Sequence, residues 1–291
     1  MRLGDRSESE NVEDDRGSGP RAGGLVLGGG GLVLALFLMV LGVDPRQALQ
    51  VVGRPQPGQA GGQQGGPPRQ ADPEEEKEAH FTKVIFGDTE RIWTEEFRKA
   101  GKTYAKPTLH LYSGMVDSAC GQAEAAVGPF YCPGDSKVYI DLAFYQDMQK
   151  KLNAPGDFAR AYVVAHEVGH HVQKLLGYTK YVDRARASGD KVEANRASVR
   201  LELQADYLAG VWAHYGQEQY KFLDPGDIDS ALNAAFEIGD DRLQKKSRGY
   251  VVPDAFTHGT SKQRMKWFKQ GFDTGDVKGA SKLFDLDYDA L

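Results

Sequence analysis

The chain has 291 residues, of which 40% are apolar and 26% are charged, as is ordinary for a soluble globular domain. Its 36 basic and 41 acidic residues give a formal net charge of −5, so the charge balance gives no support to nucleic-acid binding. No internal repeat is visible, and the length fits one domain of medium size with attached segments.

The first 73 residues are predicted to lie outside the folded domain. Residues 1–21 are polar, mixed in charge and rich in Glu, Asp, Gly and Ser, a composition typical of disordered segments. Residues 23–43 carry no charge, and a stretch of that length can cross the core of a bilayer. A signal peptide is the rival interpretation, but no Ala-x-Ala-like site follows, so we expect a transmembrane helix over residues 22–43. Residues 44–73 are rich in Gly, Gln and Pro and are expected to form a flexible linker.

Arginines flank the predicted span unequally. Three precede it and two follow it within a similar distance: Arg6, Arg16 and Arg21, then Arg46 and Arg54. Because positive residues favour the cytoplasmic side, this three-to-two bias places the N-terminus in the cytoplasm and the remaining domain outside it. We therefore expect a single-pass membrane protein with an extracytoplasmic domain.

The folded part is expected to span residues 74–291. Apolar residues recur at helical spacing over residues 74–100, and residues 108–112 alternate between apolar and polar side chains as a strand does. Two more strands are predicted, followed by four helices: strands 123–127 and 137–142, then helices 158–176, 193–215, 227–243 and 261–271. A small sheet followed by a mostly helical chain indicates an α+β fold.

Cys120 and Cys132 are the only cysteines in the chain. An even pair in a domain outside the cytoplasm favours a disulfide that closes a short loop. Two unrelated buried thiols are the alternative. A structural zinc site is disfavoured, because it would need two more ligands nearby.

The segment His166-Glu167-Val168-Gly169-His170 has the pattern H-E-x-x-H. Residues four apart lie on the same face of a helix, so His166 and His170 can both direct a ring nitrogen at one Zn²⁺. Glu167 would then reach the attacking water rather than the metal. Gly169 is a poor helix former, which suggests that another backbone approaches the helix there. A buried helix that carries two histidines by chance is the alternative.

A catalytic zinc site usually has three protein ligands. The metzincin continuation would need Gly and His where this chain has Gln173 and Leu176. Glu202 and Asp206 lie four residues apart on the next predicted helix and would face the same way. We expect Glu202 to be the third ligand and Asp206 to accept a hydrogen bond from a ligand histidine, which fixes its tautomer. Glu193 is the alternative ligand, and a solvated helix face is the alternative interpretation of the pair.

Four stretches of the sequence carry a combined pattern within about residues 75–272: Cys120–Asp141, His166–His170, Glu202–Asp206 and Phe256–Arg264. Together with the hydrophobic N-terminal segment, they resemble the bacterial, membrane-anchored neutral zinc metallopeptidases of the gluzincin type. The resemblance implies a zincin-like fold, Zn²⁺ as cofactor, a peptide or protein substrate, and a place in the bacterial cell membrane. It also implies that one edge strand lies beside the zinc cleft, where an extended peptide can pair with it.

Peptide hydrolysis at such a site needs a general base and a donor that stabilises the oxyanion. Glu167 is the expected base. His258 is the first candidate for the oxyanion donor, with a loop or N-cap histidine as the alternative interpretation. Tyr250 is the second candidate, and Tyr178 and His214 are further candidates without a distinguishing pattern.

The sequence thus predicts a zinc-dependent endopeptidase that is tethered to the membrane. The alternative is a non-catalytic binding or quality-control module that keeps a zinc site for stability. Glu167 favours the enzyme, because a structural zinc site needs no general base and is closed by four protein ligands.

Overall fold

The computed structural model describes residues 1–17, 72–124 and 128–291. Residues 1–15 and 72–291 form one compact unit, which contains every helix and strand discussed below. The predicted transmembrane helix over residues 22–43 and nearly all of the predicted linker lie outside the described residues.

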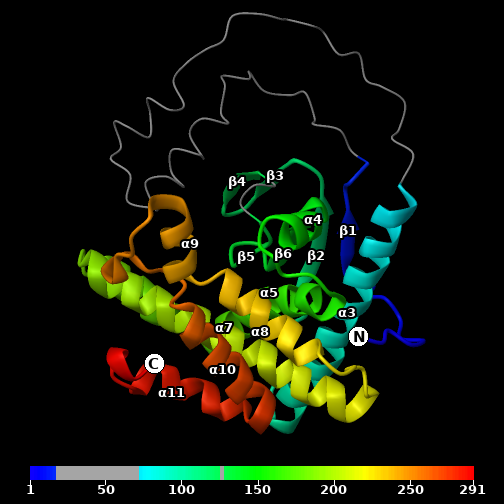
Figure 1. Cartoon of the computed structure of the whole chain (residues 1–291). Coiled ribbons are helices and arrows are strands. Elements are labelled where there is room, and N and C mark those ends of the chain that lie inside the picture. Colours follow the sequence, from blue (N-terminus) through cyan, green and yellow to red (C-terminus); the bar gives the residue numbers. More distant parts are fainter. Residues whose placement is uncertain (18–71, 125–127) are drawn as a thin grey trace, which may run out of the picture. The chain divides into compact units, whose positions relative to one another are not determined.

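The compact unit is mostly helical (Figure 1). Its helices are α3 (Pro73–Lys99), α4 (Ala143–Lys150), α5 (Asp157–Leu176), α6 (Thr179–Ala187), α7 (Lys191–Tyr220), α8 (Asp227–Glu237), α9 (Asp240–Arg248), α10 (Ser261–Thr274) and α11 (Lys282–Asp285). The predicted helix over residues 227–243 is two helices. Gly239 separates α8 from α9, and it packs so closely that an added Cβ would lie 2.3 Å from the backbone nitrogen of Ser261.

A small mixed sheet accompanies the helices. Its strands are β1 (Val12–Asp14), β2 (Thr108–Tyr112), β5 (Phe130–Cys132) and β6 (Lys137–Asp141), in the order β1-β2-β6-β5. The pairs β1–β2 and β2–β6 are parallel, and β5 pairs antiparallel with β6 as an edge strand. A separate hairpin pairs β3 (Met115–Ser118) with β4 (Gly121–Glu124). The predicted strands at 108–112 and 137–142 are confirmed, whereas β1, β3 and β5 were not predicted.

The N-terminal segment is ordered where the sequence predicted disorder. Val12 pairs with Leu109 in the β1–β2 ladder, and the Asn11 side chain donates to a Glu90 oxygen over 2.7 Å. The polar residues that suggested disorder are satisfied by α3, as in the 3.3 Å ion pair of Arg6 with the buried Asp88. Residues 1–15 therefore belong to the folded domain, and the predicted disorder of residues 1–21 is wrong for this part.

The prediction of a single-pass membrane protein also needs correction. In the part of the chain that the structure describes, no helix is both long and apolar enough to cross a membrane. In addition, β1 precedes the predicted span and pairs with β2, which follows it. One crossing between them would put the two strands on opposite sides of the bilayer. The predictions of a transmembrane helix and of a single-pass membrane localisation are therefore wrong, and membrane anchoring is not supported.

Three helices pack on one another through glycines. An added Cβ on Gly169 of α5 would lie 3.1 Å from the Ala205 oxygen of α7, which explains why a poor helix former occupies this position. The contact of α7 with α10 is closer, since a Cβ on Gly271 would lie 2.0 Å from the Tyr207 oxygen. Figure 1 shows α10 lying along α7. Backbone contact through these glycines fixes the spacing of the three helices.

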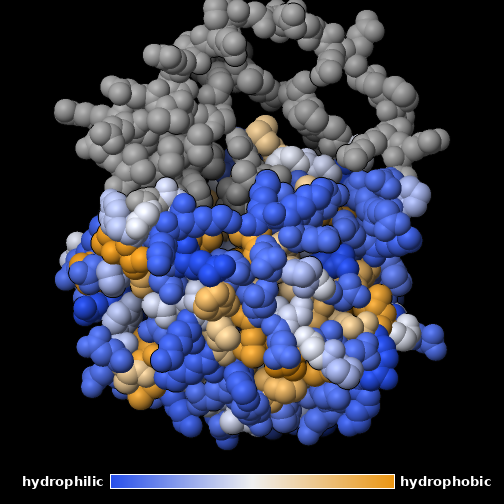
Figure 2. Space-filling view, viewed as in Figure 1, coloured by the Kyte–Doolittle hydropathy of each residue, from blue (hydrophilic) through white to orange (hydrophobic). Residues whose placement is uncertain are grey.

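The apolar core lies between these helices and the sheet. Its largest fully buried side chains include Trp93, Trp212, Trp267 and Tyr162. The face in Figure 2 is mostly hydrophilic, with hydrophobic residues in scattered groups. Removal of these large apolar side chains from water stabilises the folded unit.

Gly271→Ala is expected to lower the free energy of unfolding by roughly 3 kcal/mol, because a Cβ would collide with a backbone oxygen that cannot rotate away. Gly169→Ala is the matched comparison. The added Cβ at position 169 meets the Ala205 oxygen less closely. The gain of about 1 kcal/mol in helix propensity therefore offsets much of the free-energy cost of this contact. Urea denaturation of both variants measures the difference. Equal stability of Gly271→Ala and the wild type would contradict the packing described here.

Candidate metal centre

Helices α5 and α7 bring together the three ligands predicted from the sequence. His166, His170 and Glu202 each offer an atom within 4.8 Å of the others. His166 Nε2 lies 3.2 Å from one Glu202 oxygen, and His170 Nε2 lies 3.5 Å from the other. The Nε2 atoms of both histidines therefore face the third ligand, as one shared ion requires.

The second ring nitrogen of each histidine has its own partner. His166 Nδ1 lies 2.8 Å from Asp206 Oδ1, so the structure places Asp206 where the sequence predicted it. His170 Nδ1 lies 2.9 Å from Gln173 Oε1, a contact that the sequence analysis did not predict. Both partners can accept a hydrogen bond from Nδ1–H, an arrangement that directs Nε2 of each ring at a metal. With Zn²⁺ bound, the donor set would be two neutral imidazoles and a carboxylate.

Asp206 is itself held by a buried network. Arg264 of α10 binds it through two nitrogens, at 2.8 Å to Oδ2 and 2.9 Å to Oδ1. The Tyr162 hydroxyl donates to Oδ1 over 2.5 Å. Neither residue was predicted. Tyr162 lies four residues before His166 on the same helix face, and this spacing was the signal available for it.

Charges at the centre compensate one another. Burial alone would lower the pKa of His166, but Asp206 and Glu202 outweigh it and raise that pKa to about 10. Burial raises the pKa of Glu202, and the two histidines reverse that effect and lower it well below its ordinary value. Burial also raises the pKa of Glu167, against the opposing effect of both histidines. Without a metal, His166 therefore carries a second ring proton, and a metal would have to displace it.

His258 lies close enough to the centre to interact electrostatically with Glu202, although it does not contact the three ligands through a hydrogen bond. Asp240 positions it. Its Oδ2 accepts from the backbone N–H of Thr257 at 2.7 Å and of His258 at 2.6 Å, and its Oδ1 lies 3.1 Å from His258 Nδ1. The side chain of His258 is half exposed, so its other nitrogen is accessible to a ligand.

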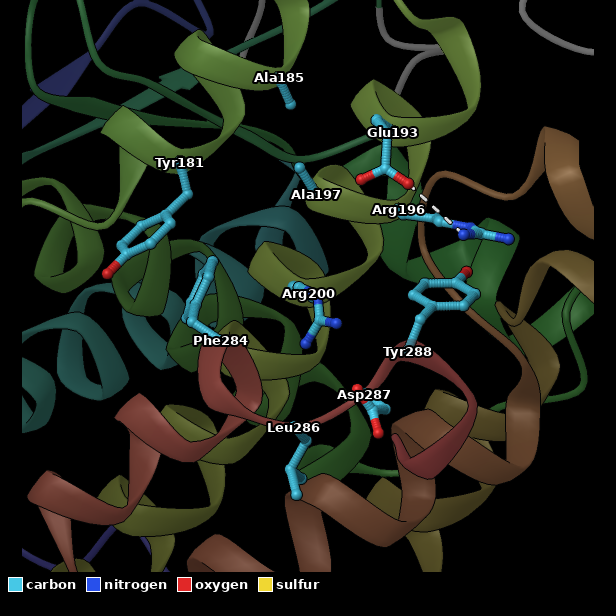
Figure 3. Close-up of a pocket in the computed structure, with 10 residues that line it drawn as sticks. All are labelled: Tyr181, Ala185, Glu193, Arg196, Ala197, Arg200, Phe284, Leu286, Asp287 and Tyr288. Carbon is cyan, nitrogen blue, oxygen red and sulfur yellow. Dashed lines mark hydrogen bonds and ion pairs between the residues drawn. The ribbon is translucent and has the colours of Figure 1, made fainter.

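The remaining candidates lie elsewhere. Glu193 forms an ion pair with Arg196 at the edge of a separate pocket between α6, α7 and the C-terminal residues (Figure 3). Tyr178 stacks on Phe284 near that pocket, and His214 Nδ1 binds the Phe272 oxygen. Tyr250 is 61% exposed. Glu193 is therefore wrong as the alternative metal ligand.

Strand β5 lies beside the metal helix. The hydroxyl of Tyr131 on this strand lies 2.9 Å from Nδ1 of His171 on α5. The next residue, Cys132, forms a disulfide with Cys120, which confirms the predicted pairing. The disulfide joins β5 to the loop between β3 and β4, so the hairpin and the edge strand are covalently linked next to the centre.

Comparison with known proteins identifies the family. The chain matches the family described as "Putative neutral zinc metallopeptidase" over residues 1–282, and it belongs to that family. It is 52% identical over 282 residues to the uncharacterized protein YpfJ of Escherichia coli (strain K12), which covers 95% of this chain and 96% of the relative. An uncharacterized protein of Mycobacterium bovis is 45% identical to this chain over 183 residues. The match covers 60% of this chain and 61% of the relative. No solved structure matches.

Family membership and the His–His–Glu group agree on the cofactor, which is Zn²⁺. Three protein ligands of this chemistry are the usual set of a catalytic zinc site, which keeps one position open. The family implies a peptide or protein as the substrate class.

Zinc affinity is expected to rise with pH between pH 6 and 8. The pKa of His166 is raised to about 10 without metal, so Zn²⁺ must displace a proton throughout this range. Each displaced proton makes affinity rise about tenfold per pH unit. Competition with a chelator at pH 6, 7 and 8, corrected for protonation of the chelator, measures the slope. A flat profile would show that the ligands are already deprotonated.

Proposed function

We propose that this protein is a zinc-dependent endopeptidase that hydrolyses peptide bonds, with Glu167 as the general base. The observation that carries the proposal is the position of Glu167. It is buried beside the three-residue group formed by His166, His170 and Glu202, yet it is not one of that group. A structural zinc site has no use for a further carboxylate that is held beside the ligands without being one of them.

Zn²⁺ bound at this centre would activate a water molecule and polarise the scissile carbonyl. Glu167 accepts the proton of the attacking water and passes it to the leaving amine. The raised pKa of Glu167 suits both transfers, because it brings proton affinity closer to neutral pH. His166 and Glu202 keep their orientation during the reaction through Asp206 and the α5–α7 contact.

His258 is the proposed donor to the oxyanion. Burial would lower its pKa, but Asp240 and Glu202 outweigh this effect and raise it above its ordinary value. When the ring is protonated, Nδ1–H donates to Asp240 and Nε2–H is available to donate to the oxyanion in the tetrahedral state. Asp240 therefore supports the assignment of His258 over that of Tyr250.

Glu167→Gln tests the proposed base. It keeps the size of the side chain and removes the proton acceptor, so zinc content and fold should survive while cleavage of fluorescein-labelled casein falls at least 10²-fold. Glu90→Gln is the control, because it changes a buried carboxylate on α3. Equal cleavage by wild type and Glu167→Gln would refute the mechanism. If the zinc-loaded wild type cleaves neither casein nor a broad peptide library, the non-catalytic binding module becomes the better interpretation.

Glu202→Ala and Asp206→Asn separate the proposed ligand from its supporting residue. Loss of a ligand should abolish stoichiometric zinc binding, whereas Asp206→Asn should weaken affinity about 10- to 100-fold. Asp88→Asn is a matched control, because Asp88 is also a buried aspartate that is paired with arginine, but it lies on α3. Metal analysis after chelator competition provides the measurement. Unchanged zinc binding in Glu202→Ala would exclude Glu202 as a ligand.

A further inference from the structure

The pocket between α6, α7 and the C-terminal residues has no part in the proposed hydrolysis (Figure 3). Its volume is about 390 Å³, which is enough for a small molecule. Its lining includes none of the metal-binding group His166, His170 and Glu202, and neither Glu167 nor His258. The pocket is therefore a second site, whose ligand has to be inferred from its own residues.

One side of the pocket is aromatic and apolar. Figure 3 shows Tyr181 of α6 beside Phe284 of α11, and their ring centroids lie 4.5 Å apart. Tyr181 and Leu286 are 46% and 38% exposed, so apolar surface remains in contact with water on this side. A flat apolar group that covers this surface is stabilised by removing it from water.

Two arginines one turn apart on α7 form the other side of the pocket (Figure 3). The guanidinium groups of Arg196 and Arg200 both lie over the ring of Tyr288, at 5.0 Å and 5.9 Å from its centroid. Cation–π contacts of this kind hold the planar groups in place before a ligand arrives.

Arg200 carries the positive charge that is left for a ligand. Arg196 is paired with Glu193 at 3.4 Å and with Asp254 at 4.0 Å. Arg200 donates to the Leu283 oxygen instead, and it forms no ion pair within the residues that the structure describes. Burial lowers the pKa of Arg200 from its ordinary value, because the guanidinium is partly removed from water. An anion in the pocket would compensate this charge.

The acidic residues of the lining restrict the charge of that anion. Glu193 is already paired with Arg196, and Asp287 is exposed, so water screens its charge. A dianion such as a phosphate monoester would meet both carboxylates with only one unpaired arginine to bind it. A carboxylate carries a single charge, and its two oxygens match the planar fork of a guanidinium.

We propose that this pocket binds a small monocarboxylic acid that carries a flat apolar group. The carboxylate pairs with Arg200, and the apolar group packs on Tyr181 and Leu286. This inference does not depend on the proposed function, because the pocket shares no residue with the metal-binding group.

The probe is 3-phenylpropionate, and 3-phenylpropionamide is its uncharged match of the same size. Isothermal titration calorimetry on zinc-loaded full-length protein should give a Kd of roughly 1 mM for the acid, as expected for about eleven non-hydrogen atoms. The amide should bind at least tenfold more weakly, because it cannot form the charge-assisted hydrogen bonds. Zinc-free protein should bind the acid with the same Kd, since no lining residue belongs to the metal-binding group.

Substitutions locate the bound acid. Arg200→Met should raise the Kd at least tenfold. Its control is Arg242→Met, which removes an arginine that also lies over an aromatic ring, 4.8 Å from the Phe236 centroid, but outside the pocket. Ala197→Leu keeps both arginines and fills the space between them and the aromatic side, so it tests the site even if Arg200→Met does not fold. Ala194→Leu, on the same helix but outside the lining, should bind as the wild type does.

Several results would overturn the proposal. Equal affinity for the acid and the amide would remove the role of the charge, and no binding of the acid at about 10 mM would remove the site. A wild-type Kd in Ala197→Leu, or the same loss in the control variants, would place the acid elsewhere or reduce the effect to destabilisation. A Kd that depends on zinc would place the acid at the metal centre. The proposed hydrolysis is tested separately by Glu167→Gln and survives any of these results.

Discussion

The structure depends on one buried carboxylate. Asp206 lies inside the protein, where an unpaired charge would cost several kcal/mol. It is stabilised by Arg264 from α10 and by Tyr162 and His166 from α5. The two positive partners outweigh burial and lower its pKa to about 2, so it stays ionised. The same charge thus joins three helices and orients a metal ligand.

This arrangement explains the close helix packing. Arg264 reaches Asp206 with two nitrogens only because α10 lies against the backbone of α7, and Gly271 permits that approach. Likewise, Gly169 lets α5 approach α7, so that His166 and Glu202 lie within reach of one ion. The glycines that weaken each helix locally are therefore required by the geometry of the centre. Fold stability and metal-site geometry are not separable here.

The sequence predicted the pairs of site residues that lie one helical turn apart on the same helix. The spacing of His166 and His170, and of Glu202 and Asp206, gave the group that the structure brings together, because helical periodicity places such pairs on one face. The helices α3, α5, α7 and α10 followed from the same periodicity, whereas α4 and α6 were not predicted.

Partners from distant segments could not be predicted in this way. Arg264 follows Asp206 by 58 residues, and His171 follows Tyr131 by 40. Their contacts depend on how the chain crosses itself, which local patterns do not report. The N-terminal error has the same origin. Composition described residues 1–21 correctly as polar, but it could not show that β2 and α3 provide partners for residues 1–15.

The disulfide between Cys120 and Cys132 makes the segment beside the metal centre sensitive to reduction, whereas the zinc ligands contain no thiol. Cys132 is the neighbour of Tyr131 and the last residue of β5, whereas all three ligands lie on α5 and α7. A dithiol would cleave this bond by thiol–disulfide exchange and release the hairpin from the edge strand without touching a ligand. The redox state of the surroundings thus acts on the segment beside the metal centre rather than on a ligand.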